Sequence, residues 1–283
     1  MPAPAPETGD GTDALRALLA APDAGIPMLP ALAQRVIAAV AGGNTPVWQI
    51  ASLASKDQVL AARLLGLANS AYCAPLHPIS TVQEAIVRMG TAAVRNLVVT
   101  VCVASRLHDP LVYGRQGRSI VEHGLGAAYL ARLVAERAGV NADEAFLCGL
   151  LHDLGKLVIL KRVHDLARTG RPVPDHAALE ALIAELHAAV GADALARWEL
   201  PEEICEAVRW HHTPDTAPRF QRRAMVTALA SRLAHRYGFG CTASDAPFLD
   251  DPSAQALGLD EAWLAGTDQH APGLFDVARQ LLN

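Results

Sequence analysis

Residues 146–160 read FLCGLLHDLGKLVIL, an apolar run whose only polar side chains are His152, Asp153 and Lys156. We expect this run to lie in one helix, residues 142–162, that is buried on most sides. A lone carboxylate in apolar surroundings is strongly destabilising, so Asp153 needs a partner. The run therefore predicts a helical core with a polar centre, which either a metal ion or a network of histidines could complete.

The composition favours helices throughout the chain. Hydrophobic residues make up 51% of the 283 residues and aromatic residues only 5%, and much of the apolar content is alanine and leucine. These two residues lose little conformational freedom in a helix, and no segment alternates as a strand does. The sequence predicts an all-α fold, with helices at 57–68, 82–89, 91–103, 119–138, 142–162, 176–198 and 220–237, one that begins at Pro201, and one or two within 259–282.

Two breaks in the helical pattern indicate the domain organisation. Residues 1–12 are rich in proline, alanine, glycine and threonine, which predicts a disordered tail. A second break, over residues 107–118, contains one proline and two glycines. We therefore expect two helical subdomains, residues 13–110 and residues 111–283, the second of which ends in closing helices.

The charge balance argues against nucleic acids and membranes as partners. The net charge is -5 and the isoelectric point about 6.1, so no overall attraction to polyanions is expected. We interpret Arg219, Arg222 and Arg223 as a solvated loop and helix start. No apolar run is long enough to predict a membrane span, and no secretory signal is apparent. The five cysteines form no CxxC pair, and their odd number favours a reducing, cytoplasmic location.

Three segments of the first half carry a resemblance to a known family. They are LPALAQRV (29–36), IASLASKDQVLAARLLGLANSAY (50–72) and ISTVQEAIVRMG (79–90). These segments strongly resemble the HDOD family of bacterial signal-transduction proteins, and the resemblance covers roughly residues 25–237. It implies an HDOD-type helical bundle packed on a bundle like that of the HD phosphohydrolases. One departure is Gln58, which stands where the family usually has proline.

The second half resembles the HD superfamily, and this resemblance implies a metal site. Carried over from members with two metal ions, the first ion would bind His123, His152 and Asp153. The second would bind Asp153 again, together with three further histidines: His187, His211 and His212. The ions would be iron, manganese or zinc, and the alternative is a metal-free, hydrogen-bonded histidine network. Lys156 matches the HD-x-x-K position, where the enzymes place a cation near the phosphate. Five further histidines match no position and are expected to be ordinary surface or loop residues: His108, His164, His176, His235 and His270. His77, in the loop 75–78, is expected to be structural.

One position departs from the catalytic pattern. In catalytic members the first ion also uses an aspartate from a later helix, and Ser231 stands where that aspartate would align. Residues 216–244 contain no aspartate or glutamate at all. The Gly-Tyr-Pro signature of one phosphodiesterase subgroup is also absent after His212. One half of the metal pair therefore lacks a carboxylate.

Two functions remain open. The first is a regulatory signalling module without turnover, in which the first half contacts a signalling protein and the histidine site has a structural or sensory role. The second is a metal-dependent phosphohydrolase or phosphodiesterase that acts on a nucleotide or cyclic dinucleotide. In the second, Asp153 would bridge the ions and Lys156 would stabilise charge on the phosphate oxygens. The missing carboxylate favours the first.

Overall fold

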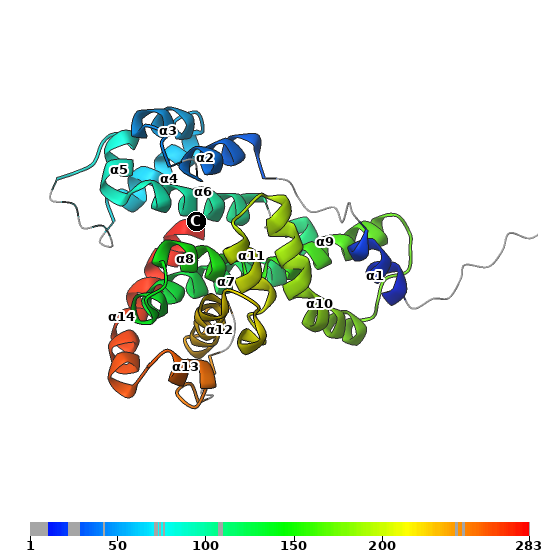
Figure 1. The fold of residues 1–283 in the computed structure, drawn as a ribbon. Helices are drawn as coiled ribbons and strands as arrows, with labels where there is room; N and C mark the ends of the chain where they lie inside the picture. The colour runs from blue at the N-terminus through cyan, green and yellow to red at the C-terminus, as the bar shows by residue number, and fades with distance from the viewer. Residues whose placement is uncertain are drawn as a thin grey trace, which may run out of the picture.

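The described part of the chain is built from helices (Figure 1). A computed structural model describes residues 11–21, 29–41, 43–70, 73, 75, 77–106, 110–240, 243, 244 and 247–282. Within these ranges no strand occurs, so the predicted all-α class is confirmed. The helices are α1 (Thr12–Ala20), α2 (Ala31–Ala41), α3 (Val47–Ala54), α4 (Gln58–Ala68), α5 (Val82–Met89), α6 (Thr91–Arg106), α7 (Pro110–Ala138), α8 (Ala142–Leu151), α9 (Leu154–Arg168), α10 (His176–Arg197), α11 (Glu202–Arg209), the short 3-10 helix η1 (Pro214–Thr216), α12 (Gln221–Arg236), α13 (Pro252–Ala256) and α14 (Glu261–Leu282).

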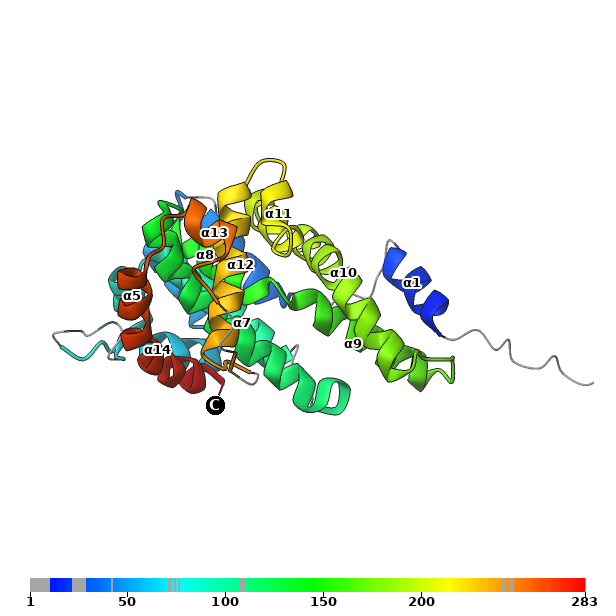
Figure 2. The ribbon, with the colours of Figure 1, turned by 90° about the horizontal axis from the view of Figure 1, so that it is seen from below.

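The helices gather in three groups (Figures 1 and 2). Helices α2 to α6 form one bundle, and α7, α8, α11 and α12 pack together below it, with α13 and α14 beside them. Helices α9 and α10 project as an antiparallel pair, and Figure 2 shows α1 lying along them. Arg16 of α1 donates a hydrogen bond of 2.8 Å to Glu185 of α10, which fastens the two helices at the surface. The predicted boundary between subdomains, at residue 110, stays a prediction.

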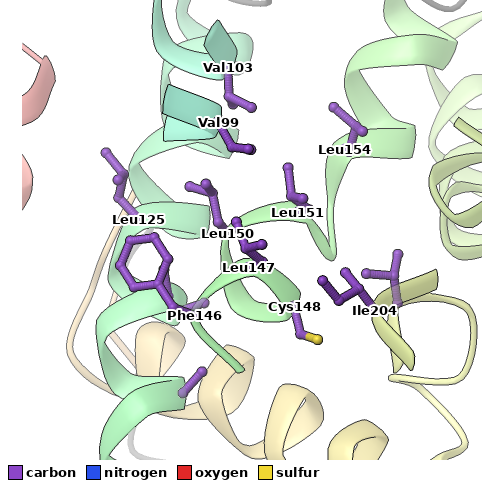
Figure 3. Packing of buried hydrophobic residues seen from close by; sticks show 14 of the residues in the cluster. Val99, Val103, Leu125, Phe146, Leu147, Cys148, Leu150, Leu151, Leu154 and Ile204 are labelled. Atoms are coloured by element: carbon purple, nitrogen blue, oxygen red, sulfur yellow. The ribbon is translucent and has the colours of Figure 1, made fainter. Parts of the chain in front are cut away.

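Helix α8 is the centre of the hydrophobic core. All seven residues from Ala145 to Leu151 are buried, because α6, α7, α11 and α12 surround the helix. Figure 3 shows Leu150 and Leu151 near Val99 and Val103 of α6, while Cys148 lies on the side of Ile204. A helix that is apolar all round is typical of such a core position. The apolar run that opens at residue 146 is therefore explained by burial on every side.

Two predicted elements are wrong in detail. The helix expected over 142–162 is two helices, α8 and α9, separated by a turn at His152 and Asp153. The break expected over 107–118 is present only as a kink at Gly114 (φ 54°, ψ -144°), where two helical stretches of α7 meet, and the described residues on both sides of it are helical from Pro110 onward. Residues 107–109 lie outside the described ranges. The predicted tail, 1–12, lies outside them as well, apart from its last two residues.

The arginines at the start of α12 do not form a free basic patch. Arg219 pairs with Glu202 and Glu206, and Arg223 pairs with Glu144 at 2.6 Å. Their placement agrees with the predicted loop and helix start. No single described helix is both long and apolar enough to cross a membrane; α5 and α6 pass that test only as a pair bent by 111°.

Candidate metal centre

Five helices bring the predicted site residues to one point. His123 lies on α7, His152 and Asp153 form the turn between α8 and α9, and His187 lies on α10. His211 and His212 follow the end of α11. Of these six residues, only His212 is exposed. Lys156 lies one turn into α9 with its side chain 29% exposed, so it reaches the centre from the protein surface.

Asp153 is the shared carboxylate of the site. Its Oδ2 accepts a hydrogen bond of 2.7 Å from Lys156 and lies 3.5 Å from Nε2 of His152. Its Oδ1 lies 3.4 Å from Nε2 of His187. Asp153 occupies the position that precedes α9, yet its side chain makes no capping hydrogen bond to the helix. The carboxylate is therefore directed to the histidines rather than to the backbone.

The ionised form of Asp153 is favoured. Burial alone would raise the pKa of this carboxyl, but the neighbouring His152 and Lys156 outweigh burial and hold the pKa well below its usual range. Since the carboxylate is 6% exposed, its charge must be compensated within the protein. When no ion is bound, the ammonium group of Lys156 supplies that compensation.

The first group of potential ligand atoms consists of His123, His152 and Asp153, which offer one atom each within 4.8 Å of one another. The Ser231 hydroxyl on α12 lies 3.2 Å from Nε2 of His123. Ser231 therefore lies directly beside His123, and its match to the missing aspartate stays a prediction. Among the described residues the group contains one carboxylate, that of Asp153.

The second group consists of His187, His211 and His212, whose ligand atoms also lie within 4.8 Å of one another. Nε2 of His212 lies 3.0 Å from Nε2 of His187. The ring centroids of His211 and His212 are 4.0 Å apart. Because Asp153 also contacts His187, its carboxylate lies between the two groups.

The four buried histidines share one hydrogen-bonding pattern at Nδ1. In each ring Nδ1 contacts a backbone carbonyl oxygen, at distances from 2.6 to 3.3 Å: Phe239 for His123, Gly149 for His152, Ile183 for His187 and Val208 for His211. A carbonyl only accepts, so Nδ1 carries the proton and Nε2 of the neutral ring keeps its lone pair. Nε2 of His152 and of His211 is buried without a hydrogen-bond partner.

This arrangement fits a bound cation. A neutral imidazole whose Nδ1 donates to a carbonyl and whose Nε2 is left bare is the form in which histidine binds metals. Burial lowers the pKa of His123 to about 4 and that of His211 to about 3, the latter with help from His212. Burial likewise lowers the pKa of His152 and His187. All four rings are therefore neutral at pH 7.

Close helix packing sets the distance between the two groups. A Cβ atom on Gly155 would lie 1.9 Å from the carbonyl oxygen of His187, so only glycine allows α9 to approach α10 this closely. On the other side, a Cβ atom on Gly149 would lie 2.5 Å from the carbonyl oxygen of Ala127 in α7. The two glycines flank His152 and Asp153 and let the surrounding helices converge on them.

His235 belongs to the site and was not predicted to do so. Its side chain is exposed, as expected of a surface residue, but its ring centroid lies 4.3 Å from that of His123. His235 follows Ser231 by four residues on α12, so the two side chains share one helix face. That spacing was the signal in the sequence that could have revealed it.

The fold and the site together define an all-helical protein with two histidine groups around one buried aspartate. The sequence profile of the HDOD domain matches residues 26–214, and the chain therefore belongs to the HDOD domain family. The resemblance seen in the sequence is confirmed by this match.

Curated relatives match parts of longer proteins. An uncharacterized protein from Treponema pallidum is 26% identical over 221 residues, which cover 75% of this chain and 42% of that protein. Ribonuclease Y from Symbiobacterium thermophilum is 30% identical over 122 residues, which cover 43% of this chain and 19% of that enzyme. The chain thus spans less than half the length of either relative.

Solved structures with a similar fold cover the chain almost completely. An HDOD domain protein of unknown function from Geobacter sulfurreducens has a TM-score of 0.73 at 24% identity, covering 96% of this chain and 98% of its own. A candidate metal-dependent phosphohydrolase from Shewanella amazonensis has a TM-score of 0.74 at 17% identity, covering 97% and 99%. At these identities the likeness shows the fold alone.

Proposed function

We propose that this protein is a regulatory module of bacterial signal transduction that binds one or two divalent metal ions and does not turn over a substrate. The observation that carries the proposal is the contact between Ser231 and His123. The hydroxyl of Ser231 is neutral, and the resemblance to catalytic members of the superfamily implies a carboxylate at this position. The centre keeps histidine ligands for a cation but has one carboxylate to share between two positions.

The residues present would divide between two ions. His123, His152 and Asp153 would hold the first ion. Asp153, His187, His211 and His212 would hold the second. Imidazole together with one carboxylate suits borderline cations, so iron, manganese or zinc is expected. Bound metal would supply a positive charge that orders the turn at Asp153, and this suits a structural or sensory role.

Elemental analysis tests the metal part of the proposal. Protein purified without a chelating resin is compared with a His152→Ala/Asp153→Ala double variant. His176→Ala, at the exposed start of α10, is the matched control. Metal near one equivalent in the wild type and in the control, lost in the double variant, is the expected result. Absence of metal from the wild type, with no gain in stability when metal is added, would contradict it.

The second candidate is a metal-dependent phosphohydrolase or phosphodiesterase that acts on a nucleotide or cyclic dinucleotide. It is favoured by Lys156, whose partly exposed ammonium lies beside Asp153 and could meet a phosphate oxygen. A metal ion, when bound, would activate water for attack on phosphorus.

A turnover screen separates the two candidates. Cyclic dinucleotides, nucleotides and, given the ribonuclease Y relatives, a short RNA are incubated with the protein and added manganese or iron. We expect no hydrolysis. Reproducible hydrolysis that Asp153→Ala abolishes would overturn the regulatory proposal.

The partner of the module is expected to be a signalling protein. A solved structure with a similar fold, from Marinobacter aquaeolei, is described as a candidate signal transduction protein, with a TM-score of 0.67 at 22% identity. It covers 92% of this chain, and this chain covers 60% of it. The bundle α2–α6 contains none of the residues of the metal centre, which leaves its surface available for a partner.

A further inference from the structure

A cavity lies beside the first histidine group, where Ser244 and Phe248 approach α12. Its volume is about 270 Å³, and it is lined by Arg232, His235, Arg236, Ser244 and Phe248. Pockets for drug-sized ligands span roughly 300 to 1,000 Å³, so this cavity suits a smaller molecule. None of these five residues was assigned a role from the sequence.

The lining of this cavity combines cations with neutral donors. Both guanidinium groups come from α12, where Arg232 and Arg236 are one turn apart and therefore neighbours on the helix. The Arg232 side chain is 43% exposed and that of Arg236 33% exposed, so a ligand from solvent can reach both. Ser244 adds a hydroxyl, and the buried Phe248 adds an apolar wall.

Two ion pairs hold the guanidinium groups in place without using all their donors. Arg232 pairs with Asp251 and donates a second hydrogen bond, of 2.7 Å, to the carbonyl oxygen of Pro247. Arg236 lies 3.7 Å from Asp268, which also accepts a hydrogen bond from Tyr237. A guanidinium carries five N–H donors in a planar fork that matches phosphate oxygens. Each arginine can therefore be positioned by its carboxylate and still bind an anion.

His235 connects the cavity with the histidine centre. It lines the cavity, and its ring centroid lies 4.3 Å from that of His123. The backbone carbonyl of His235 also accepts a hydrogen bond of 3.0 Å from the amide of Ser244, on the opposite wall. A ligand that moves either wall would therefore shift His235 against His123.

We propose that this cavity binds a small phosphorylated ligand through Arg232, Arg236 and Ser244, and that His235 transmits the binding to His123. The planar guanidinium groups of the two arginines match the oxygens of a phosphate, so they favour a phosphorylated ligand over an uncharged one. The cavity volume excludes a folded macromolecule as the bound group. The inference goes beyond the proposed function and does not require a metal ion in either histidine group.

The test is a titration of the full chain after metal removal with a chelator. Inorganic phosphate and glycerol 3-phosphate are added separately at constant ionic strength, with sodium chloride as the reference. Binding is followed by the thermal midpoint and by the imidazole nitrogen signals of His123 and His235. We expect a saturable rise of the midpoint for at least one of the two probes, with both imidazole signals moving at the same dissociation constant.

Variants then assign the binding to the cavity. Arg236→Gln removes one guanidinium group, and Ser244→Asp adds a negative charge that repels a phosphate without substituting either arginine or its partner carboxylate. Each should weaken binding by about ten-fold or more. Arg168→Gln, at the exposed end of α9, is the matched control and should bind as the wild type does. Ser244→Asp keeps the test valid if Arg236→Gln does not fold.

Three results would overturn the inference: no saturable change with either probe, equal binding by wild type and Ser244→Asp, or equal loss in Arg168→Gln. Loss of the His123 response alone would overturn the transmission through His235. Because the protein is free of metal throughout, none of these results bears on the elemental analysis, and the two proposals fail separately.

Discussion

The hydroxyl of Ser231 lies 3.2 Å from Nε2 of His123, the nitrogen that this ring would offer to a cation. His123 donates from Nδ1 to Phe239, so Nε2 accepts the serine hydrogen in the neutral ring. The serine hydroxyl donates its hydrogen to the lone pair of this nitrogen, whereas a carboxylate in the same place would itself be a ligand for a cation. We therefore expect the first histidine group to bind a cation more weakly than the second.

Restoring the carboxylate should strengthen the first position. Ser231→Asp places a negative charge beside His123 and should raise the manganese content by up to one equivalent. Elemental analysis and calorimetric titration measure the change. Ser231→Asn, which has the same shape without the charge, is the control and should leave the content unchanged. Equal metal content in wild type and Ser231→Asp would show that this position does not bind an ion.

The neutral histidines make the metal-free protein sensitive to acid. In the folded state the pKa is about 4 for His123 and about 3 for His211, while in the unfolded chain both are near 6.5. Between these values the unfolded state binds more protons, so stability is present above pH 6.5 and falls as the pH decreases. From pH 7 to pH 5 the two rings together should lower the free energy of unfolding by about 2–4 kcal/mol.

Urea denaturation at the two pH values measures this loss. His123→Asn should reduce the difference between pH 7 and pH 5, because the substituted side chain does not titrate. His176→Asn, which alters an exposed ring, should not. Stability that is unchanged or higher at pH 5 would contradict the burial of neutral rings.

Much of the fold and most of the centre could be predicted from the sequence. The alanine- and leucine-rich pattern predicted an all-helical chain, and all six predicted ligand residues come together within two adjacent groups. Their metal binding stays a prediction. The spacing of His152 and Asp153 in an apolar run was informative because a buried carboxylate requires partners from other helices.

The helix break at His152 could not be read from periodicity. Neither proline nor a left-handed glycine marks it, and both sides of the turn are equally apolar. The break brings Gly155 of α9 against α10, a contact between helices that the local sequence does not encode. His235 was missed for a related reason, since its four-residue spacing from Ser231 becomes informative only once α12 is known to lie against His123 of α7.

The close approach at Gly155 predicts a severe defect when a methyl group is added. In Gly155→Ala the new Cβ would lie 1.9 Å from the His187 backbone oxygen, so α9 and α10 must separate. We expect the free energy of unfolding to fall by about 1–3 kcal/mol or more, with loss of metal binding. Gly66→Ala in α4, where no atom lies within 4 Å of the added Cβ, should be neutral or slightly stabilising. Urea denaturation compares the two, and equal effects would contradict the packing.

Substitution of Lys156 tests whether a divalent ion can neutralise the Asp153 carboxylate in place of the lysine. Lys156→Gln removes the only cation within 3 Å of the Asp153 carboxylate among the described residues and leaves that charge buried. The free energy of unfolding should fall by about 1–3 kcal/mol, because breaking a buried pair is costly but Lys156 is partly exposed.

A bound divalent ion would restore the missing charge beside Asp153. Added manganese should therefore raise the thermal midpoint of Lys156→Gln by more than it raises that of the wild type. Lys161→Gln, which loses a surface pair with Asp165, should respond to manganese as the wild type does. An equal response of all three proteins would mean that the ion does not reach Asp153.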